Sequence, residues 1–280
     1  MAAFGALAQG TLLDQALAIE ADLQGYPARA ESELAALMPR ADAAPAAERR
    51  IVYALYGQAM ALRGKVADAE DLAGRLDGGT PRTRDPADRA AALVVRAAIE
   101  SSFGEASKSL AHAQLARDLV AGSGDPHLHY WAAMALGIAA RTRGRPEDAM
   151  ANLHDALSLA EAADNPFRRS SALYQLSVLQ RELKNVPEAL ASSLAAYRFA
   201  EAAKCAYAMV NARMAESAVM ELLDRPAREL AAMQEALAIA RSSRSTTAEA
   251  KALINLADIR LRRKAYAEAA SLSRRASSLA

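Results

Sequence analysis

Residues 125–160 read DPHLHYWAAMALGIAARTRGRPEDAMANLHDALSLA, and this stretch predicts a pair of antiparallel helices. Asp125 and Pro126 form a typical helix start, because aspartate accepts hydrogen bonds from the free N–H groups of the first turn and proline fits the first helical position. Gly144 marks the end of the first helix, since glycine adopts a left-handed C-cap without steric cost. Pro146 then begins the second helix. The stretch therefore contains its own start, turn and second start.

The same helix pair recurs along the chain with a period of 40 residues. Small residues occupy two columns of the repeat where paired helices would cross, and a third column near the end of the second helix. The columns read Gly57, Ala97, Gly137, Ser177, Ser217, Ala257; Ala69, Ser109, Ala149, Ala189, Glu229, Ala269; and Leu76, Ala116, Ala156, Ala196, Ala236, Ala276. One constant period predicts stacked helical repeats. At Glu229 we expect the crossing to open or the carboxylate to reach solvent.

These columns resemble those of the tetratricopeptide repeat, which places a large residue and then Gly or Ala midway through its first helix and alanines in its second. Leu136–Gly137, Ala149 and Ala156 fit this pattern. The long unit is similar to those of kinesin light chains, Gram-positive peptide-pheromone receptors and the N-terminal sensor regions of bacterial signalling proteins such as GGDEF-type diguanylate cyclases. The resemblance implies an all-α fold, a right-handed α-solenoid of about seven antiparallel helix pairs.

We expect residues 1–280 to form a single solenoid. Its units would be roughly 1–44, 45–84, 85–124, 125–164, 165–204, 205–244 and 245–280. The junction before Cys205 has neither Pro nor Gly, which predicts nearly continuous helix there. The last helix carries Leu272 and Leu279, which we place on a face that would meet another unit. We therefore expect the chain to be the N-terminal part of a longer protein.

Composition and charge exclude several classes of function. The chain carries 34 Lys and Arg against 33 Asp and Glu, so its charge gives no reason to expect nucleic-acid binding. A single cysteine excludes an internal disulfide framework. No apolar run approaches membrane-spanning length, and the first residues lack the basic segment of a signal peptide. We therefore expect a cytoplasmic bacterial protein with neither nucleic-acid nor membrane partners.

The sequence contains no recognisable catalytic or cofactor-binding motif. His127 and His129 diverge on a helix and cannot share a metal ion, and no group of His, Cys, Asp and Glu has zinc-ligand spacing. The glycines mark turns, and acidic pairs such as Glu147–Asp148 begin helices, where the helix dipole favours negative charge. We expect no enzyme activity, cofactor or metal within these residues.

The resemblance also implies where a partner would bind, because the first helices of tetratricopeptide pairs line a concave face. Chaperone-binding relatives hold a terminal carboxylate with a lysine in the midpoint column of the first helix. Here that column reads Ala54, Val94, Met134, Tyr174, Met214, Ile254, and we reject such a clamp. The candidate groove residues are Trp131, Met134, Arg141, Tyr174, Arg181, Asn211, Met214 and Asn255. Large amphipathic side chains and arginines are typical interface anchors. The alternative for Trp131 and Tyr174 is the core between repeats.

We expect a non-catalytic module that binds a protein or peptide segment in its groove, as the sensory or regulatory half of a signalling protein. The alternatives are a self-association module, in which Leu272 and Leu279 or the convex surface form a homodimer, and a regulatory subunit of an enzyme. Replacing both Trp131 and Tyr174 by alanine is predicted to abolish partner capture while leaving helicity nearly unchanged.

Overall fold

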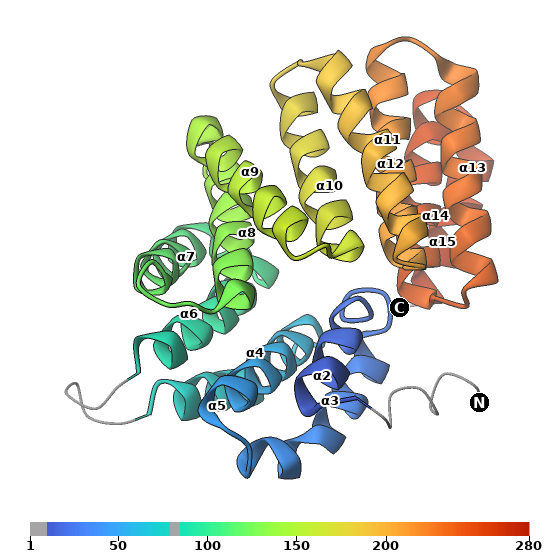
Figure 1. Ribbon diagram of the computed structural model, residues 1–280. Helices are drawn as coiled ribbons and strands as arrows, with labels where there is room; N and C mark the ends of the chain where they lie inside the picture. Colours follow the sequence, from blue (N-terminus) through green and yellow to red (C-terminus); the bar gives the residue numbers. More distant parts are fainter. Residues whose placement is uncertain (1–9, 79–84, 280) are drawn as a thin grey trace. The chain divides into compact units, whose positions relative to one another are not determined.

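Figure 1 shows the computed structural model of the chain, which is described for residues 10–78 and 85–279. Every regular element in these residues is an α-helix. The helices are α2 (Leu12–Glu20), α3 (Pro27–Asp42), α4 (Ala46–Leu62), α5 (Val66–Leu76), α6 (Pro86–Ser102), α7 (Ala106–Val120), α8 (Pro126–Thr142), α9 (Pro146–Ala162), α10 (Pro166–Glu182), α11 (Val186–Ala202), α12 (Ala206–Leu222), α13 (Pro226–Ser242), α14 (Thr246–Arg262) and α15 (Tyr266–Ser277). The predicted all-α fold of stacked antiparallel helix pairs is confirmed.

The helices group into two compact units, Met1–Leu159 and Ala160–Ala280, which we call unit 1 and unit 2. In unit 1, α6 packs against α4 and α8 and against its own second helix α7. In unit 2, α12 packs in the same way against α10, α14 and α13. The first helix of each of these pairs therefore contacts the first helices of the repeats before and after it.

Short turns with one left-handed residue separate the helices of unit 2. These residues are Lys184, Lys204, Asp224, Arg244 and Lys264, with φ of 65°, 53°, 50°, 56° and 60°. The following N–H closes each turn, as where Asn185 N donates to Gln180 O at 2.8 Å. Such a turn lies at Lys204, so the prediction of nearly continuous helix before Cys205 was wrong. The turn hydrogen bonds hold a lysine in a conformation that glycine adopts more easily.

Replacing Lys264 by glycine should stabilise unit 2 by about 1 kcal/mol, because a side chain at positive φ is strained and glycine is not. The lysine side chain is exposed, so little else is lost. Urea unfolding followed by circular dichroism measures the change. Gly144→Ala is the opposite control. It should destabilise by a similar amount, because Gly144 has φ of 69°. An added Cβ would meet no atom within 4 Å, so the loss would come from the strained backbone and not from a clash. Equal stability of both variants with the wild type would contradict the strained turns.

Small residues bring the paired helices close enough for side chains to bond the facing backbone. Ser177 Oγ donates to Ala189 O at 2.8 Å, which joins α10 to α11. The direction is reversed between α6 and α7, where Ser109 Oγ donates to Ala97 O at 3.0 Å. The two small columns therefore mark the crossing points of the helices.

The crossing at Glu229 stays closed and its carboxylate stays buried. Ser217 Oγ of α12 donates to Glu229 O at 2.9 Å, so the helices remain close. Glu229 is 6% exposed, and its carboxylate pairs with Arg262 and, at 2.8 Å, with Arg263. Both parts of the expectation for this residue were wrong, because two guanidinium groups at the end of α14 neutralise the charge inside the protein.

Two leucines at the end of the chain, Leu272 in α15 and Leu279 just after it, are partly buried. Ala276 is 4% exposed, and Leu272 and Leu279 pack against a core cluster that includes Met233 of α13 and Leu253 of α14. Both leucines therefore contact the core of unit 2, and their expected position on a face that would meet another unit stays a prediction.

Candidate functional site

The first helices of unit 2 bring together two tyrosines, an asparagine and a lysine. Lys251 of α14 lies between them. Its Nζ donates to Asn211 Oδ1 at 2.8 Å and to the Tyr207 hydroxyl at 3.4 Å, both on α12. It also lies 5.9 Å from the ring centroid of Tyr174 on α10 and 5.2 Å from that of Tyr207. These distances are within cation–π range. We call these four residues the tyrosine–lysine cluster.

The repeat explains why these side chains meet. Asn211 and Lys251 are 40 residues apart and occupy the same position of α12 and α14, which pack side by side. Tyr207 precedes Asn211 by four residues and so lies on the same face of α12. The cluster therefore spans three successive repeats.

Lys251 has no carboxylate partner within residues 10–78 and 85–279. Its contacts are an amide oxygen, a phenol and two aromatic rings. The Lys251 residue is only partly exposed, so solvent does not fully replace a carboxylate partner. Burial raises the pKa of Tyr207, so the phenol stays neutral near pH 7 and supplies no counter-charge. A partly buried ammonium group without a counter-ion favours the binding of an anion, because the hydrogen bonds of such a pair are charge-assisted.

Other predicted groove residues of unit 2 lie on the same three helices. Met214 is partly buried and packs against the core cluster of the unit. Asn255 donates to the Lys251 carbonyl of its own helix at 2.8 Å. Arg181 is partly exposed and lies seven residues beyond Tyr174 on α10. The structure thus brings Tyr174 and Asn211 together, while Met214 serves the core.

The predicted groove residues of unit 1 are placed differently. Trp131 is 5% exposed, and its indole Nε1 donates to Glu20 Oε1 of α2 at 2.7 Å. Met134 and Arg141 are partly buried farther along α8. Helix α2 also packs against α4, where Ile51 occupies the column of Trp131 and is 2% exposed. In unit 1 this column belongs to the core, which is the alternative that the sequence leaves open for Trp131.

Sequence reasoning missed Tyr207 and Lys251. Lys251 shares its column with Trp131 and Asn211, three residues before the midpoint column. This column was also expected to face the groove, but a carboxylate-binding lysine was sought only in the midpoint column, where chaperone-binding relatives carry it, so Lys251 was not chosen as a site residue. Reading one turn earlier on α12 would have found Tyr207.

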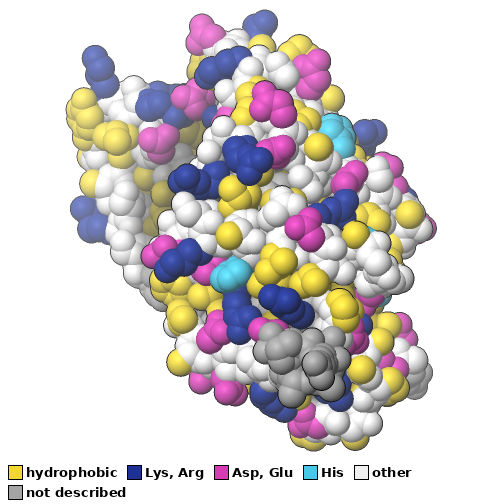
Figure 2. All heavy atoms as spheres, turned by 90° about the vertical axis from the view of Figure 1, so that its left-hand side faces the viewer, with side chains coloured by type: hydrophobic (Ala, Val, Ile, Leu, Met, Phe, Trp, Pro, Cys, Tyr) yellow, Lys and Arg dark blue, Asp and Glu magenta, His cyan; other side chains and the backbone are white. Residues whose placement is uncertain are grey.

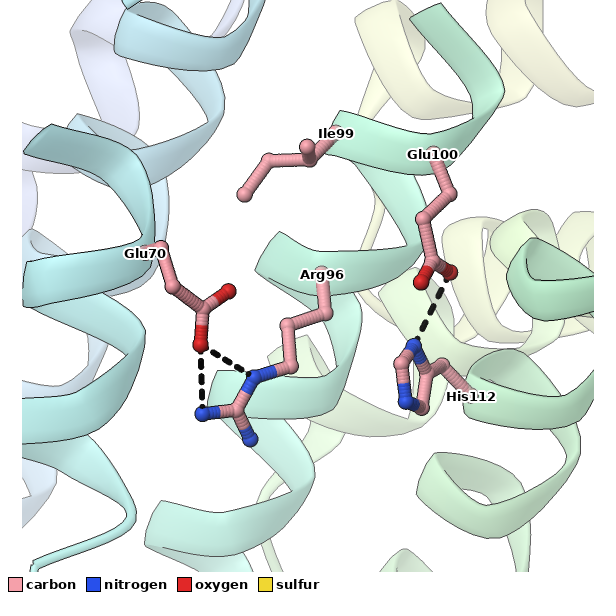
Figure 3. A pocket seen from close by; sticks show the side chains of 5 residues that line it. All are labelled: Glu70, Arg96, Ile99, Glu100 and His112. Carbon is pink, nitrogen blue, oxygen red and sulfur yellow. Dashed lines mark hydrogen bonds and ion pairs between the residues drawn. The ribbon is translucent and has the colours of Figure 1, made fainter. Parts of the chain in front are cut away.

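A second candidate is a pocket of about 300 Å³ between α5, α6 and α7 in unit 1. Its lining residues are Glu70, Arg96, Ile99, Glu100 and His112, none of which was expected from the sequence. Figure 3 shows Glu70 and Glu100 on opposite sides of the pocket, with Arg96 paired to the first and His112 to the second.

Basic and acidic side chains are interspersed on the surface drawn in Figure 2. This agrees with the net charge of +1. Recognition at either candidate site therefore depends on local groups rather than on a broad field of one sign. In the described part of the chain, no three His, Cys, Asp or Glu residues are grouped so as to hold a metal ion. Nor does that part contain a helix both long enough and apolar enough to span a membrane.

The helix pairs, the small crossing columns and the repeating turns define the class of fold, which is a tetratricopeptide-type helical repeat. No protein-family model matches the sequence, and no curated protein does. The fold is similar to that of a Rap protein complexed with Competence and Sporulation Factor, with a TM-score of 0.72 and 13% identity over 96% of this chain and 74% of that one.

Two further solved structures show the same likeness. NprR in complex with its cognate peptide NprX has a TM-score of 0.65 and 12% identity, over 96% of this chain and 77% of that chain. Aspartyl phosphate phosphatase F from Bacillus subtilis has a TM-score of 0.61 and 13% identity, over 89% of this chain and 63% of that chain. At these identities the similarity establishes the fold.

Proposed function

We propose that this protein is a non-catalytic interaction module, and that α10, α12 and α14 of unit 2 bind a peptide or protein segment carrying a carboxylate. The observation that carries the proposal is Lys251, an ammonium group held by Asn211 and two tyrosine rings without an acidic partner in the described residues. A ligand carboxylate would supply the missing charge, and the rings of Tyr174 and Tyr207 would pack against the apolar part of the segment.

The fold supports this proposal by analogy. NprR is in complex with its cognate peptide, and the Rap protein is complexed with Competence and Sporulation Factor. Fold alone does not define function, so the proposal depends on the side chains of the tyrosine–lysine cluster. Unit 1 contributes less to it, because Trp131 is occupied by Glu20.

Lys251→Met should weaken binding of an acidic segment by about tenfold, because a charge-assisted hydrogen bond contributes about 1.5–3 kcal/mol. The experiment selects peptides from a random library displayed on phage against the full chain. It then measures their affinities for the wild type and the variant by calorimetry. We expect the selected peptides to share an acidic residue or a free C-terminal carboxylate, and the amidated or Gln-substituted peptide to lose the same factor.

Lys264→Met is the matched control, because it removes the same charge from an exposed turn of the same helix pair. Binding to this variant should equal binding to the wild type. Peptides that bind Lys251→Met and the wild type equally would overturn the proposed site. Tyr174→Ala tests the aromatic contact separately, and it should lower affinity without lowering the melting temperature by more than a few degrees.

The proposed binding of a segment by unit 2 also suggests a role for the protein in regulation. We infer a sensory or regulatory role in a bacterial cytoplasmic signalling protein, in which occupancy of unit 2 alters the behaviour of an output partner. The likeness to diguanylate cyclase sensor regions rests on the style of the repeat alone. Self-association is the competing function, in which Leu272 and Leu279, partly buried against the core of unit 2, or the convex surface would form a homodimer. Light scattering at several concentrations should show a monomer.

A further inference from the structure

One carboxylate of the pocket in unit 1 replaces an apolar member of the repeat. Glu70 occupies the column that elsewhere holds Leu110, Met150, Leu190 and Leu230. Arg96 occupies the column of Tyr56, Leu136, Leu176, Glu216 and Leu256, and Glu100 occupies that of Met60, Ala140, Gln180, Met220 and Arg260. In the next repeat, Leu110 packs against a cluster that contains Leu136. The position that Glu70 occupies beside the cavity is therefore held, one repeat later, by a leucine that packs against the core.

Placing Arg96 and Glu100 between helices has an energetic cost that the fold does not require, because their side chains are only 21% and 14% exposed. Charged groups at an inter-helix position lose hydration, and replacing them with apolar residues is often neutral or stabilising. Breaks in an otherwise consistent repeat occur preferentially at functional sites. The break at Glu70, together with the carboxylate of Glu100 beside the same cavity of about 300 Å³, therefore indicates a binding site.

The pocket offers unused acceptors, while its strongest donor is occupied. Arg96 donates from Nε to Glu70 Oε1 at 2.9 Å, its Nη2 lies 2.8 Å from the same oxygen, and its Nη1 donates to Asp77 Oδ2 at 3.1 Å. His112 Nδ1 is bonded to Glu100 Oε2 at 2.9 Å. Within the described residues, Glu70 Oε2 and Glu100 Oε1 have no bonding partner. In Figure 3 these carboxylates face the space between them.

The charge and the walls of the pocket define what would fit. Among the lining residues, the two carboxylates of Glu70 and Glu100 outnumber the one guanidinium of Arg96. Ile99 supplies an apolar wall beside the two carboxylates. A suitable ligand has several N–H donors, a positive charge and an aliphatic stem.

We propose that this pocket binds a guanidinium or ammonium group on an aliphatic chain, which bridges Glu70 and Glu100 and rests its stem on Ile99. Two sources have this chemistry, namely the Arg or Lys side chain of a partner protein and a free polyamine. The site is separate from the tyrosine–lysine cluster and does not depend on its function.

The test uses n-butylguanidinium chloride as the probe and the imidazole signals of His112 as the readout in NMR spectra of the full chain. The chain has only four histidines, so each imidazole signal can be assigned. His154, which is exposed on α9, serves as the internal reference. We expect a saturable shift at His112 and none at His154. Butanoate, with a similar stem and the opposite charge, should not shift His112.

Glu100→Gln, which is isosteric, should weaken binding of the probe by about tenfold. Glu147→Gln removes the same charge at the start of α9 and should leave binding unchanged. If Glu100→Gln lowers the melting temperature, Glu70→Gln takes its place, because the Glu70 side chain is 51% exposed. Equal binding by the pocket variants and the wild type, or equal binding of butanoate, would overturn the proposal.

Two further probes identify the source of the cation. Tighter binding of a blocked Gly-Arg-Gly peptide than of n-butylguanidinium would indicate the side chain of a partner protein. Tighter binding of spermidine than of the blocked peptide would indicate a free polyamine. No shift at His112 with any of the cationic probes would show that the pocket does not bind cations.

Discussion

Replacing Trp131 by alanine should destabilise unit 1 by about 3–5 kcal/mol, the range for removing a large aromatic side chain from a core. The indole is 5% exposed and joins α8 to α2 through Glu20, a residue 111 positions earlier in the sequence. Glu20 is itself 6% exposed, so the variant also deprives a buried carboxylate of a donor. This expectation replaces the sequence-based prediction that substituting both Trp131 and Tyr174 by alanine would leave helicity nearly unchanged.

Trp131→Phe separates the two contributions, because it keeps most of the apolar ring and removes only the N–H. It should cost about 1–3 kcal/mol, the penalty for a buried acceptor that loses its donor. Urea unfolding followed by circular dichroism is the appropriate measurement, because the chain has one tryptophan and both variants remove it. If Trp131→Ala lost partner capture while unfolding at the wild-type urea concentration, the residue would belong to a binding surface after all.

The regular part of the fold was predictable because nearest-neighbour packing determines it. A helix that begins at Asp125–Pro126 and ends before Gly144 needs only local information, and the structure places α8 between these signals. The small crossing columns were predictable for the same reason, because Gly137 or Ser177 must be small for the second helix of its own pair to approach. A repeat with constant period therefore defines its helices and its crossings together.

Contacts between distant or exceptional residues could not be predicted from the repeat. The column of Trp131 indicates a face but not that Glu20 lies against it, because α2 lies three pairs away. Glu229 stands in a small column, and only the three-dimensional structure shows Arg262 and Arg263 beside its carboxylate. Lys251 lies in a column that was expected to face the groove, but its hydrogen bonds to Asn211 and Tyr207 were not predicted. At such positions the tyrosine–lysine cluster was found, and the predicted groove residue Trp131 was assigned to the core instead.

Gly137→Leu should destabilise unit 1 by about 3 kcal/mol through overpacking where α8 crosses α9. A Cβ atom on Gly137 would lie 2.8 Å from both Cγ and Cδ2 of Leu153 and 3.3 Å from its backbone nitrogen. Leu153 is fully buried, so its side chain has no solvent-exposed position to move into. The two helices would have to separate, and the small columns on which the pair depends would lose contact.

Gly74→Ala is the matched control, because Gly74 lies within α5 and no atom is within 4 Å of its added Cβ. Alanine should stabilise there by about 0.5–1 kcal/mol, since glycine disfavours helix interiors. Thermal and urea unfolding of the two variants should therefore shift in opposite directions. An unchanged midpoint for Gly137→Leu would mean that α8 and α9 are farther apart than the structure shows. The close crossing would then no longer explain why this column of the repeat is small.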